Sequence, residues 1–259
     1  MHGASGQDSQ MYPTLVALNC LARTCCINAA TTARGMQQIG LLFVLSPALC
    51  WLYPEGEARA RAFARYSGHS NTHPFMIPLF VGILLSLEEE IAKGALPESA
   101  VSSVRETLAT TLSALGDSFF SGTLLPLWAL VSVSLLLSGY VALTGIIAVG
   151  FFLALLIFRA GSFFSSLRHG MPVLVRLKRL NLINWVDRLK MVNAALVAQV
   201  IWHLPLSRMK PFPWDVYLLG ALAVLAASWL VARLRLPRIL LWGMTLGALI
   251  LMDVGLIGM

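Results

Sequence analysis

Charged residues are scarce in this sequence, and they are unevenly distributed. Only 12% of the 259 residues are Asp, Glu, Lys or Arg, whereas 58% are hydrophobic. A soluble domain carries about 25% charge, so this chain lacks the polar residues that would cover a folded surface in water. The charges that are present stand in clusters between long neutral runs, which is typical of a membrane protein.

Cysteine is also sparse, with four residues and no Cys-x-x-Cys pair. No histidine stands at zinc-finger spacing, so the sequence predicts free thiols rather than a zinc site or a disulfide framework. We expect no metal and no cofactor, and we interpret His169 and His203 as loop and interface residues. The net charge of +7 does not predict nucleic-acid binding, because the basic residues flank apolar runs.

The longest neutral run extends from Ser118 to Phe158 and contains no charged residue. As one helix its 41 residues would measure roughly 62 Å, about twice the thickness of a bilayer core. The run must therefore turn back, and Ser138-Gly139 is the natural place. We predict two membrane spans, at about 122–137 and 140–158.

A basic stretch follows, from Arg159 to Lys190, in which Asp187 is the only acid. Such an excess predicts a cytoplasmic location. Three further apolar runs follow, at 191–207, 216–232 and 239–259. If each run crosses the membrane once, the basic link at 233–238 also lies on the cytoplasmic side. The last run contains Asp253, and an acid inside a membrane span is a functional candidate by default.

The N-terminal half is less regular. The charge-free segments 35–54 and 66–87 are interrupted by prolines, and their apolar parts are short for a full span. They are either re-entrant segments, which occur at membrane depth near substrate sites, or ordinary helices with proline kinks. Helices of soluble type are predicted at 54–66 and 97–115.

These patterns predict an all-α, polytopic membrane protein with two parts. Residues 1–121 form an N-terminal helical part with broken or re-entrant segments, and residues 122–259 form a transmembrane helical part of about five apolar runs. The boundary follows Asp117, after which nearly all of the sequence is apolar.

Four short motifs occur in order between residues 35 and 126. They are GMQQIG at 35–40 followed by Ser-Pro and LYP (52–54), NTHPF at 71–75, LSLEE at 85–89, and GDSFFSGT at 116–123 with Pro126. In this order they resemble the IID component of the mannose/fructose/sorbose family of phosphotransferase systems (PTS). That family reads RMQ-x-LG with LYP, then FNTxP, then L-x-LEE, then GD-x-x-x-x-GT-x-x-P.

The resemblance implies a subunit of a sugar permease in the bacterial inner membrane. A IIC partner and this chain would form the channel, as oligomers of IIC–IID pairs in the lipid bilayer. Separate IIA and IIB proteins would carry the phosphoryl group on histidines, and IIB would phosphorylate the hexose-type sugar. This chain would then be neither catalytic nor phosphorylated.

Five polar residues within the motifs are candidates for substrate contact: Gln37, Asn71, His73, Glu88 and Asp117. Neutral amides and carboxylates supply the donors and acceptors that sugar hydroxyls need. Plainer interpretations exist as well. Asn71 and Asp117 are good helix caps. A hydrated helix end is the plainer interpretation of Glu89 and Glu90, whereas Glu88 could point into the complex.

The sequence departs from the family pattern before Met36. Members usually carry an aromatic residue and a Glu there, whereas this chain reads Thr31-Thr32-Ala33-Arg34-Gly35. The alternative hypothesis is therefore a regulatory or scaffolding membrane subunit that no longer transports. A lipid-modifying enzyme is disfavoured, because no convergent Ser/His or His/Asp/Glu set is recognisable.

Overall fold

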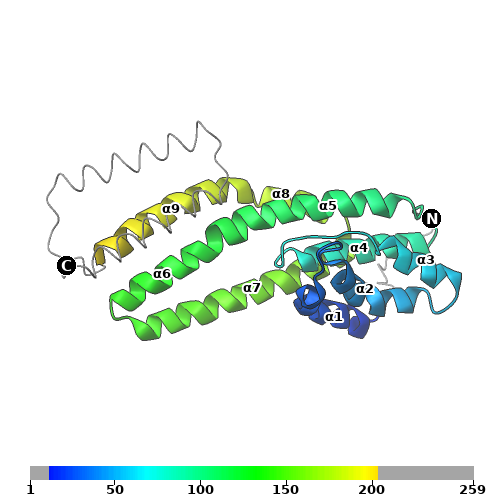
Figure 1. The fold of residues 1–259 in the computed structure, drawn as a ribbon, viewed down its shortest axis with the longest axis horizontal. Coiled ribbons are helices and arrows are strands. Elements are labelled where there is room, and N and C mark those ends of the chain that lie inside the picture. The colour runs from blue at the N-terminus through cyan, green and yellow to red at the C-terminus, as the bar shows by residue number, and fades with distance from the viewer. Residues whose placement is uncertain (1–11, 204–259) are drawn as a thin grey trace, which may run out of the picture. The chain divides into compact units, whose positions relative to one another are not determined.

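The computed structural model describes residues 12–203, which are helical almost throughout (Figure 1). The N-terminal half contains α1 (Thr14–Arg23), the 3₁₀ helix η1 (Thr24–Ala30), α2 (Gln38–Leu52), α3 (Glu57–Arg65) and α4 (Ile77–Ala92). Then come α5 (Ala100–Gly116), the π-helical η2 (Asp117–Leu124), α6 (Leu125–Leu137), α7 (Val141–His169), α8 (Val173–Arg179) and α9 (Leu182–His203). These residues hold two isolated β-bridges and no strand, so the predicted all-α fold is confirmed.

The centre of the N-terminal half is α4, whose residues 77–85 are all buried. Pro78 lies in the first turn, where a missing N–H leaves no helical hydrogen bond unmade. Gly82 lets α4 approach α7 closely, because a Cβ there would lie 2.0 Å from Ser166 Oγ and 2.6 Å from the carbonyl oxygen of Phe163. This close contact fixes the N-terminal half against α7.

The proline in α2 leaves the helix unbroken. Pro47 has no N–H to donate to Phe43, four residues earlier, and the freed carbonyl accepts hydrogen bonds from Arg23 Nη1 at 2.9 Å and Ser46 Oγ at 3.0 Å. The Arg23 guanidinium also lies 4.4 Å from the centre of the Phe43 ring. The Pro-interrupted segments thus contain the helices α2 and α4, and each helix accommodates its proline.

A single helical stretch joins α5, η2 and α6. It spans Ala100–Leu137, and its 38 residues measure about 57 Å, so only part of it fits within a bilayer core. The predicted boundary between residues 121 and 122 falls inside this stretch. The helix at 97–115 and the turn at Ser138-Gly139 are found as predicted, and Gly139 supplies the positive φ of 83° that the turn requires.

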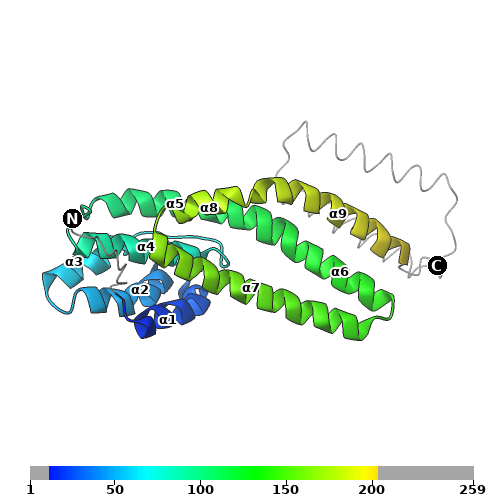
Figure 2. The ribbon, with the colours of Figure 1, turned by 180° about the vertical axis from the view of Figure 1, so that it is seen from behind.

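Among residues 12–203, two helices are long and apolar enough to cross a membrane: Ala100–Leu137 and Val141–His169. Only 6% of the apolar window of α7 is buried, unlike the core helix of a soluble protein. Figures 1 and 2 show α6 and α7 antiparallel, with α9 alongside α6 and α1–α4 around the end of α7 farthest from the turn. The predicted runs 216–232 and 239–259, with Asp253, lie outside the described residues.

Replacing Gly82 with alanine should destabilise the protein by about 1–3 kcal/mol, because the new methyl group meets a backbone carbonyl that cannot move freely. The measurement is thermal unfolding of the full chain in detergent. Gly145→Ala is the matched control, since a Cβ there meets nothing within 4 Å, and alanine favours a helix by about 0.5–1 kcal/mol. An equal effect of both substitutions would contradict the close α4–α7 contact.

Candidate functional site

Two motif segments meet where residues 35–37 lie beside the loop that leads into α4. The amide N–H of Gln37 donates to the carbonyl of Ser70 at 2.8 Å, and the amide of Ser70 donates to the carbonyl of Gly35 at 3.3 Å. Met36 adopts a positive φ of 49° and pairs with Thr32 through two backbone hydrogen bonds. The GMQQIG and NTHPF motifs are therefore joined through their backbones.

The side chain of Gln37 fixes the loop further. Its Oε1 accepts from the amide of Thr72 at 2.8 Å, and its Nε2 donates to the carbonyl of Thr72 at 2.9 Å. The same Nε2 also donates to Asn28 Oδ1 at 2.9 Å. The Gln37 side chain thus satisfies both the backbone N–H and the backbone carbonyl of Thr72. Thr72 lies between the candidates Asn71 and His73.

His73 is buried and held in one orientation. The amide N–H of Phe75 donates to its Nδ1 at 3.3 Å, and its Nε2 lies 2.9 Å from Ser121 Oγ. Because Nδ1 accepts a hydrogen bond, we infer a neutral ring with the proton on Nε2, donated to Ser121. Burial lowers the pKa of His73, and the nearby carboxylate of Asp117 opposes this effect.

The close approach of His73 to the long helix requires a glycine. A Cβ at position 116 would lie 2.3 Å from the Cβ of His73. The His73 ring also stacks on Phe120, with centroids 5.5 Å apart and planes 14° apart, and Phe75 packs on Phe120 from the loop. The GD motif therefore supports the loop through both its glycine and its aromatic residue.

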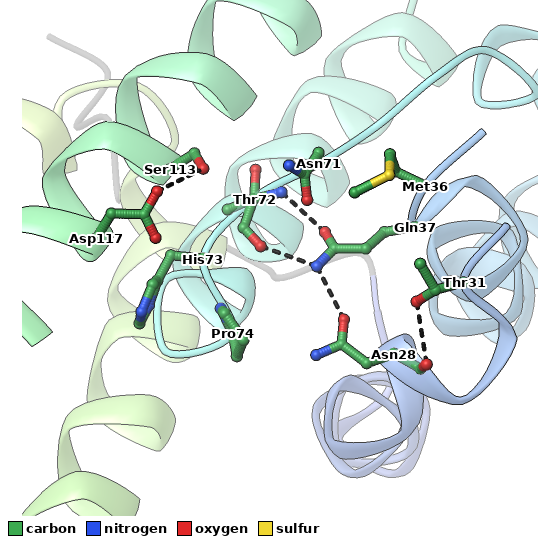
Figure 3. A pocket seen from close by; sticks show the side chains of 10 residues that line it. All are labelled: Asn28, Thr31, Met36, Gln37, Asn71, Thr72, His73, Pro74, Ser113 and Asp117. Carbon is green, nitrogen blue, oxygen red and sulfur yellow. Dashed lines mark hydrogen bonds between the residues drawn. The ribbon is translucent and has the colours of Figure 1, made fainter. Parts of the chain in front are cut away.

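Between these segments lies an open cavity of about 330 Å³, near the lower end of the volumes usual for small-ligand sites (Figure 3). It is lined by Asn28, Thr31, Met36, Gln37, Asn71, Thr72, His73, Pro74, Ser113 and Asp117. Figure 3 shows Ser113 and Asp117 on one side, Asn28 and Gln37 on the other, and the loop residues between them. The structure thus brings together four of the five candidates.

The cavity presents hydrogen-bonding groups without strong partners. The exposed amide of Asn71 has no hydrogen bond to any other residue in the described range. Asp117 is exposed and accepts only a long 3.5 Å contact from Ser113 Oγ. The lining holds one carboxylate and no Lys or Arg, so it suits a neutral polyhydroxylated ligand better than an anion.

The fifth candidate, Glu88, lies elsewhere, fully buried near the end of α4. Its Oε1 accepts from Arg65 Nε at 2.9 Å and Tyr66 Oη at 2.7 Å, and its Oε2 accepts from Arg65 Nη2 at 2.8 Å and Tyr53 Oη at 3.1 Å. Burial and the carboxylate together raise the pKa of Tyr53 to about 12 and that of Tyr66 well above its ordinary value. Within residues 12–203 this carboxylate is saturated by four donors, which explains why the LYP and LEE motifs occur together.

Two further residues connect the cavity to the long helices, and neither was predicted as a site residue. Arg159 of α7 donates to the carbonyl of Pro74 at 2.8 Å and to Thr24 Oγ1 at 3.0 Å. Asn193 of α9 donates to the carbonyl of Thr123 in η2 at 3.0 Å. The sequence shows Arg159 only as a charge that flanks an apolar run. Its contact with Pro74, 85 residues earlier, is not visible in the local sequence pattern.

The capping roles considered for Asn71 and Asp117 are not found. Neither α4, which begins at Ile77, nor η2 has a side-chain cap, and the helix runs on through Asp117. Both side chains are consequently free to face the cavity. Across the described part of the chain, no group of three His, Cys, Asp or Glu residues could hold a metal ion.

Comparison with known sequences gives the family. The family described as "PTS system mannose/fructose/sorbose family IID component" matches residues 16–204. The mannose-specific EIID component of Escherichia coli K12 is 37% identical over 106 residues, which cover 40% of this chain and 38% of that protein. The fructose permease IID component of Bacillus subtilis is 32% identical over 108 residues, 41% of this chain and 39% of that one. The matched region thus spans less than two fifths of these relatives.

Solved structures share the fold over nearly the whole chain. A structure titled only as a membrane protein has a TM-score of 0.71 at 20% identity and covers 94% of this chain and 97% of its own. The mannose transporter ManYZ in complex with microcin E492 has a TM-score of 0.58 at 21% identity, covering 94% and 96%. The fold is that of an all-α membrane protein. The chain belongs to the IID component family of the mannose/fructose/sorbose phosphotransferase systems, and it is a membrane subunit of such a system.

Acidification should weaken the fold through His73. Because its folded pKa is lowered, the stability that neutral His73 confers is complete above the ordinary histidine pKa and is lost as pH falls through the folded value. His73→Asn keeps an acceptor near the position of Nδ1 but does not titrate. We expect the variant to lose less thermal stability than the wild type between about pH 7.5 and about pH 4.5. Parallel losses in both proteins would contradict the inferred neutral ring.

Glu88→Gln should destabilise the protein by about 3 kcal/mol, because it removes the buried carboxylate charge from its pair with Arg65 and leaves Arg65 with only the exposed Glu98 as ionic partner. Denaturation in detergent, followed by tryptophan fluorescence, measures the effect. Glu90→Gln is the control, since that residue is exposed on the same helix. An unchanged midpoint for Glu88→Gln would show that the four-donor network contributes little.

Proposed function

We propose that this chain is the IID subunit of a PEP-dependent sugar permease and that, with a IIC partner, it forms the path by which a hexose-type sugar crosses the membrane. IIB phosphorylates the sugar on the cytoplasmic side, with IIA as phosphoryl donor, and this chain carries no phosphoryl group. The observation that supports this role is the polar cavity built from the family motifs, together with family membership.

Within the cavity, Asn71 and Asp117 contact the sugar hydroxyls. Asn71 offers both a donor and an acceptor, and Asp117 accepts from two hydroxyl groups. His73 has its Nε2 proton directed to Ser121, so it shapes the cavity wall and orients that serine. The side-chain amide of Gln37 is already hydrogen-bonded to Thr72 and Asn28, so Gln37 positions Asn71 and His73 for the substrate.

The altered segment before Met36 bears on specificity. Thr31 lines the cavity, and its hydroxyl donates to the carbonyl of Asn28. A threonine here leaves space that a larger side chain would fill. We therefore assign the departure from the family pattern to the choice of sugar, with transport retained, rather than to the loss of transport.

Substitutions at Asn71 and Asp117 should impair uptake. We expect Asn71→Ala to raise the apparent KM by about twofold to tenfold and Asp117→Asn by roughly tenfold or more, from the loss of a neutral and a charged hydrogen bond. The measurement is uptake of labelled mannose, fructose and sorbose by cells that carry the complete system and lack the native copy of this chain.

Controls separate transport from assembly. Ser118→Ala changes an exposed residue outside the cavity lining and should leave uptake unchanged. The cavity variants should still copurify with the IIC partner. Unchanged uptake of all three sugars in cells that lack this chain altogether would reject the transport role and favour a regulatory subunit.

A further inference from the structure

The stretch from the end of α7 through α8 to the start of α9 carries a cluster of cations without ionic partners among the described residues. Six exposed basic residues occur within 23 positions, with Asp187 as the only acid among them. They are Arg168, Arg176, Lys178, Arg179, Arg188 and Lys190. None of them forms an ion pair with another residue in the range 12–203.

The N-terminal half treats its cations differently. Four of the seven Lys and Arg residues between positions 12 and 116 pair with glutamates, namely Arg61, Arg65, Lys93 and Arg105. Arg61 and Arg65 each contact two glutamates. The fold therefore neutralises cations where carboxylates are within reach. The basic segment collects like charges instead, and nearby anions would relieve the repulsion among them.

Exposed apolar side chains stand among the same cations. They are Met171, Val175, Leu180, Ile183 and Trp185, whose exposed fractions range from 38% to 70%. Arg188 lies over the Trp185 ring, with its guanidinium carbon 5.6 Å from the centroid. Cations interspersed with apolar residues and a tryptophan are the composition of a surface that lies at the boundary between lipid and water.

The backbone holds this segment at a fixed place between the long helices. Gly170 ends α7 with a positive φ of 57° and lies against Ser86 of α4, where a Cβ would be 2.7 Å from Oγ. Asn181, with φ of 51°, turns the chain from α8 into α9. Val173 and Val186 are buried and anchor the two sides of this turn. The apolar run of α9 starts at Met191, directly after the last cation.

We propose that residues 168–190 bind anionic phospholipid headgroups and thereby fix the depth of α7 and α9 in the membrane. The headgroup phosphates neutralise the unpaired Arg and Lys side chains, and the exposed apolar residues enter the acyl boundary. Lipid is favoured over a protein partner because exposed apolar side chains and a tryptophan stand among the cations, a composition suited to a membrane surface. The surface lies apart from the cavity lining, so the proposal stands independently of the sugar site.

The test uses the full chain in neutral detergent, titrated with phosphatidylglycerol while its thermal unfolding is followed. We expect the midpoint to rise in a saturable way with phosphatidylglycerol and not with phosphatidylcholine. The triple variant Arg176→Gln/Lys178→Gln/Arg179→Gln should need about 100-fold more phosphatidylglycerol for half saturation, since each cation contributes about fivefold. Arg176→Lys/Arg179→Lys keeps the charge and should retain the response even if the glutamine variant folds poorly.

The control removes the same charge from the N-terminal half, by Arg34→Gln/Arg59→Gln/Arg61→Gln, and should leave the half-saturation point unchanged. Three results would overturn the proposal. They are an equal rise with phosphatidylcholine or with inorganic phosphate alone, an equal loss in the control triple, and no response of the wild type to phosphatidylglycerol. The last result is the one expected if the segment instead docks an acidic protein.

Discussion

The complete burial of the first part of α4 is the constraint on which the rest of the structure depends. In a helix surrounded by protein, a polar group without a hydrogen-bond partner costs free energy. Neighbouring segments must therefore supply hydrogen bonds to the polar groups at both ends of the helix. At one end Glu88 receives four hydrogen bonds, from Tyr53, Arg65 and Tyr66. Before the other end, the loop at residues 70–75 is held by the backbone of residues 35–37 and the amide of Gln37. The LYP and LEE motifs thus meet at the first of these ends, and the GMQQIG and NTHPF motifs meet before the second.

The same burial explains how the site is joined to the membrane helices. Gly82 seats α4 against α7, and Gly116 lets the long helix reach His73. From there Arg159 reaches from α7 to the loop, and Asn193 reaches from α9 to η2. π-Helical turns occur frequently at functional sites, and η2 carries Asp117, which lines the cavity, and Ser121, which contacts His73. A shift of α7 or α9 would therefore move groups that face the proposed sugar.

Charge is used in three different ways in this chain. The buried Arg65–Glu88 pair holds helices together, and Asp117 faces a cavity with no cation in its lining. The segment 168–190 leaves its cations without partners in the range 12–203. With few charges in total, each group has a distinct task, and the proposed sugar site and lipid surface occupy separate parts of the chain.

The sequence by itself determined the helical class, the turn at Ser138-Gly139 and the family. These follow from local properties: apolar run length, charge clustering and four motifs in order. It also named Gln37, Asn71, His73 and Asp117, which the structure gathers around one cavity. Their separate tasks depended on the tertiary structure, because a side chain's role is set by the partners it meets. Gln37 meets Thr72, and Glu88 meets Arg65 well away from the cavity. Arg159 and Asn28 gave no local signal, since their contacts join segments that only folding brings together.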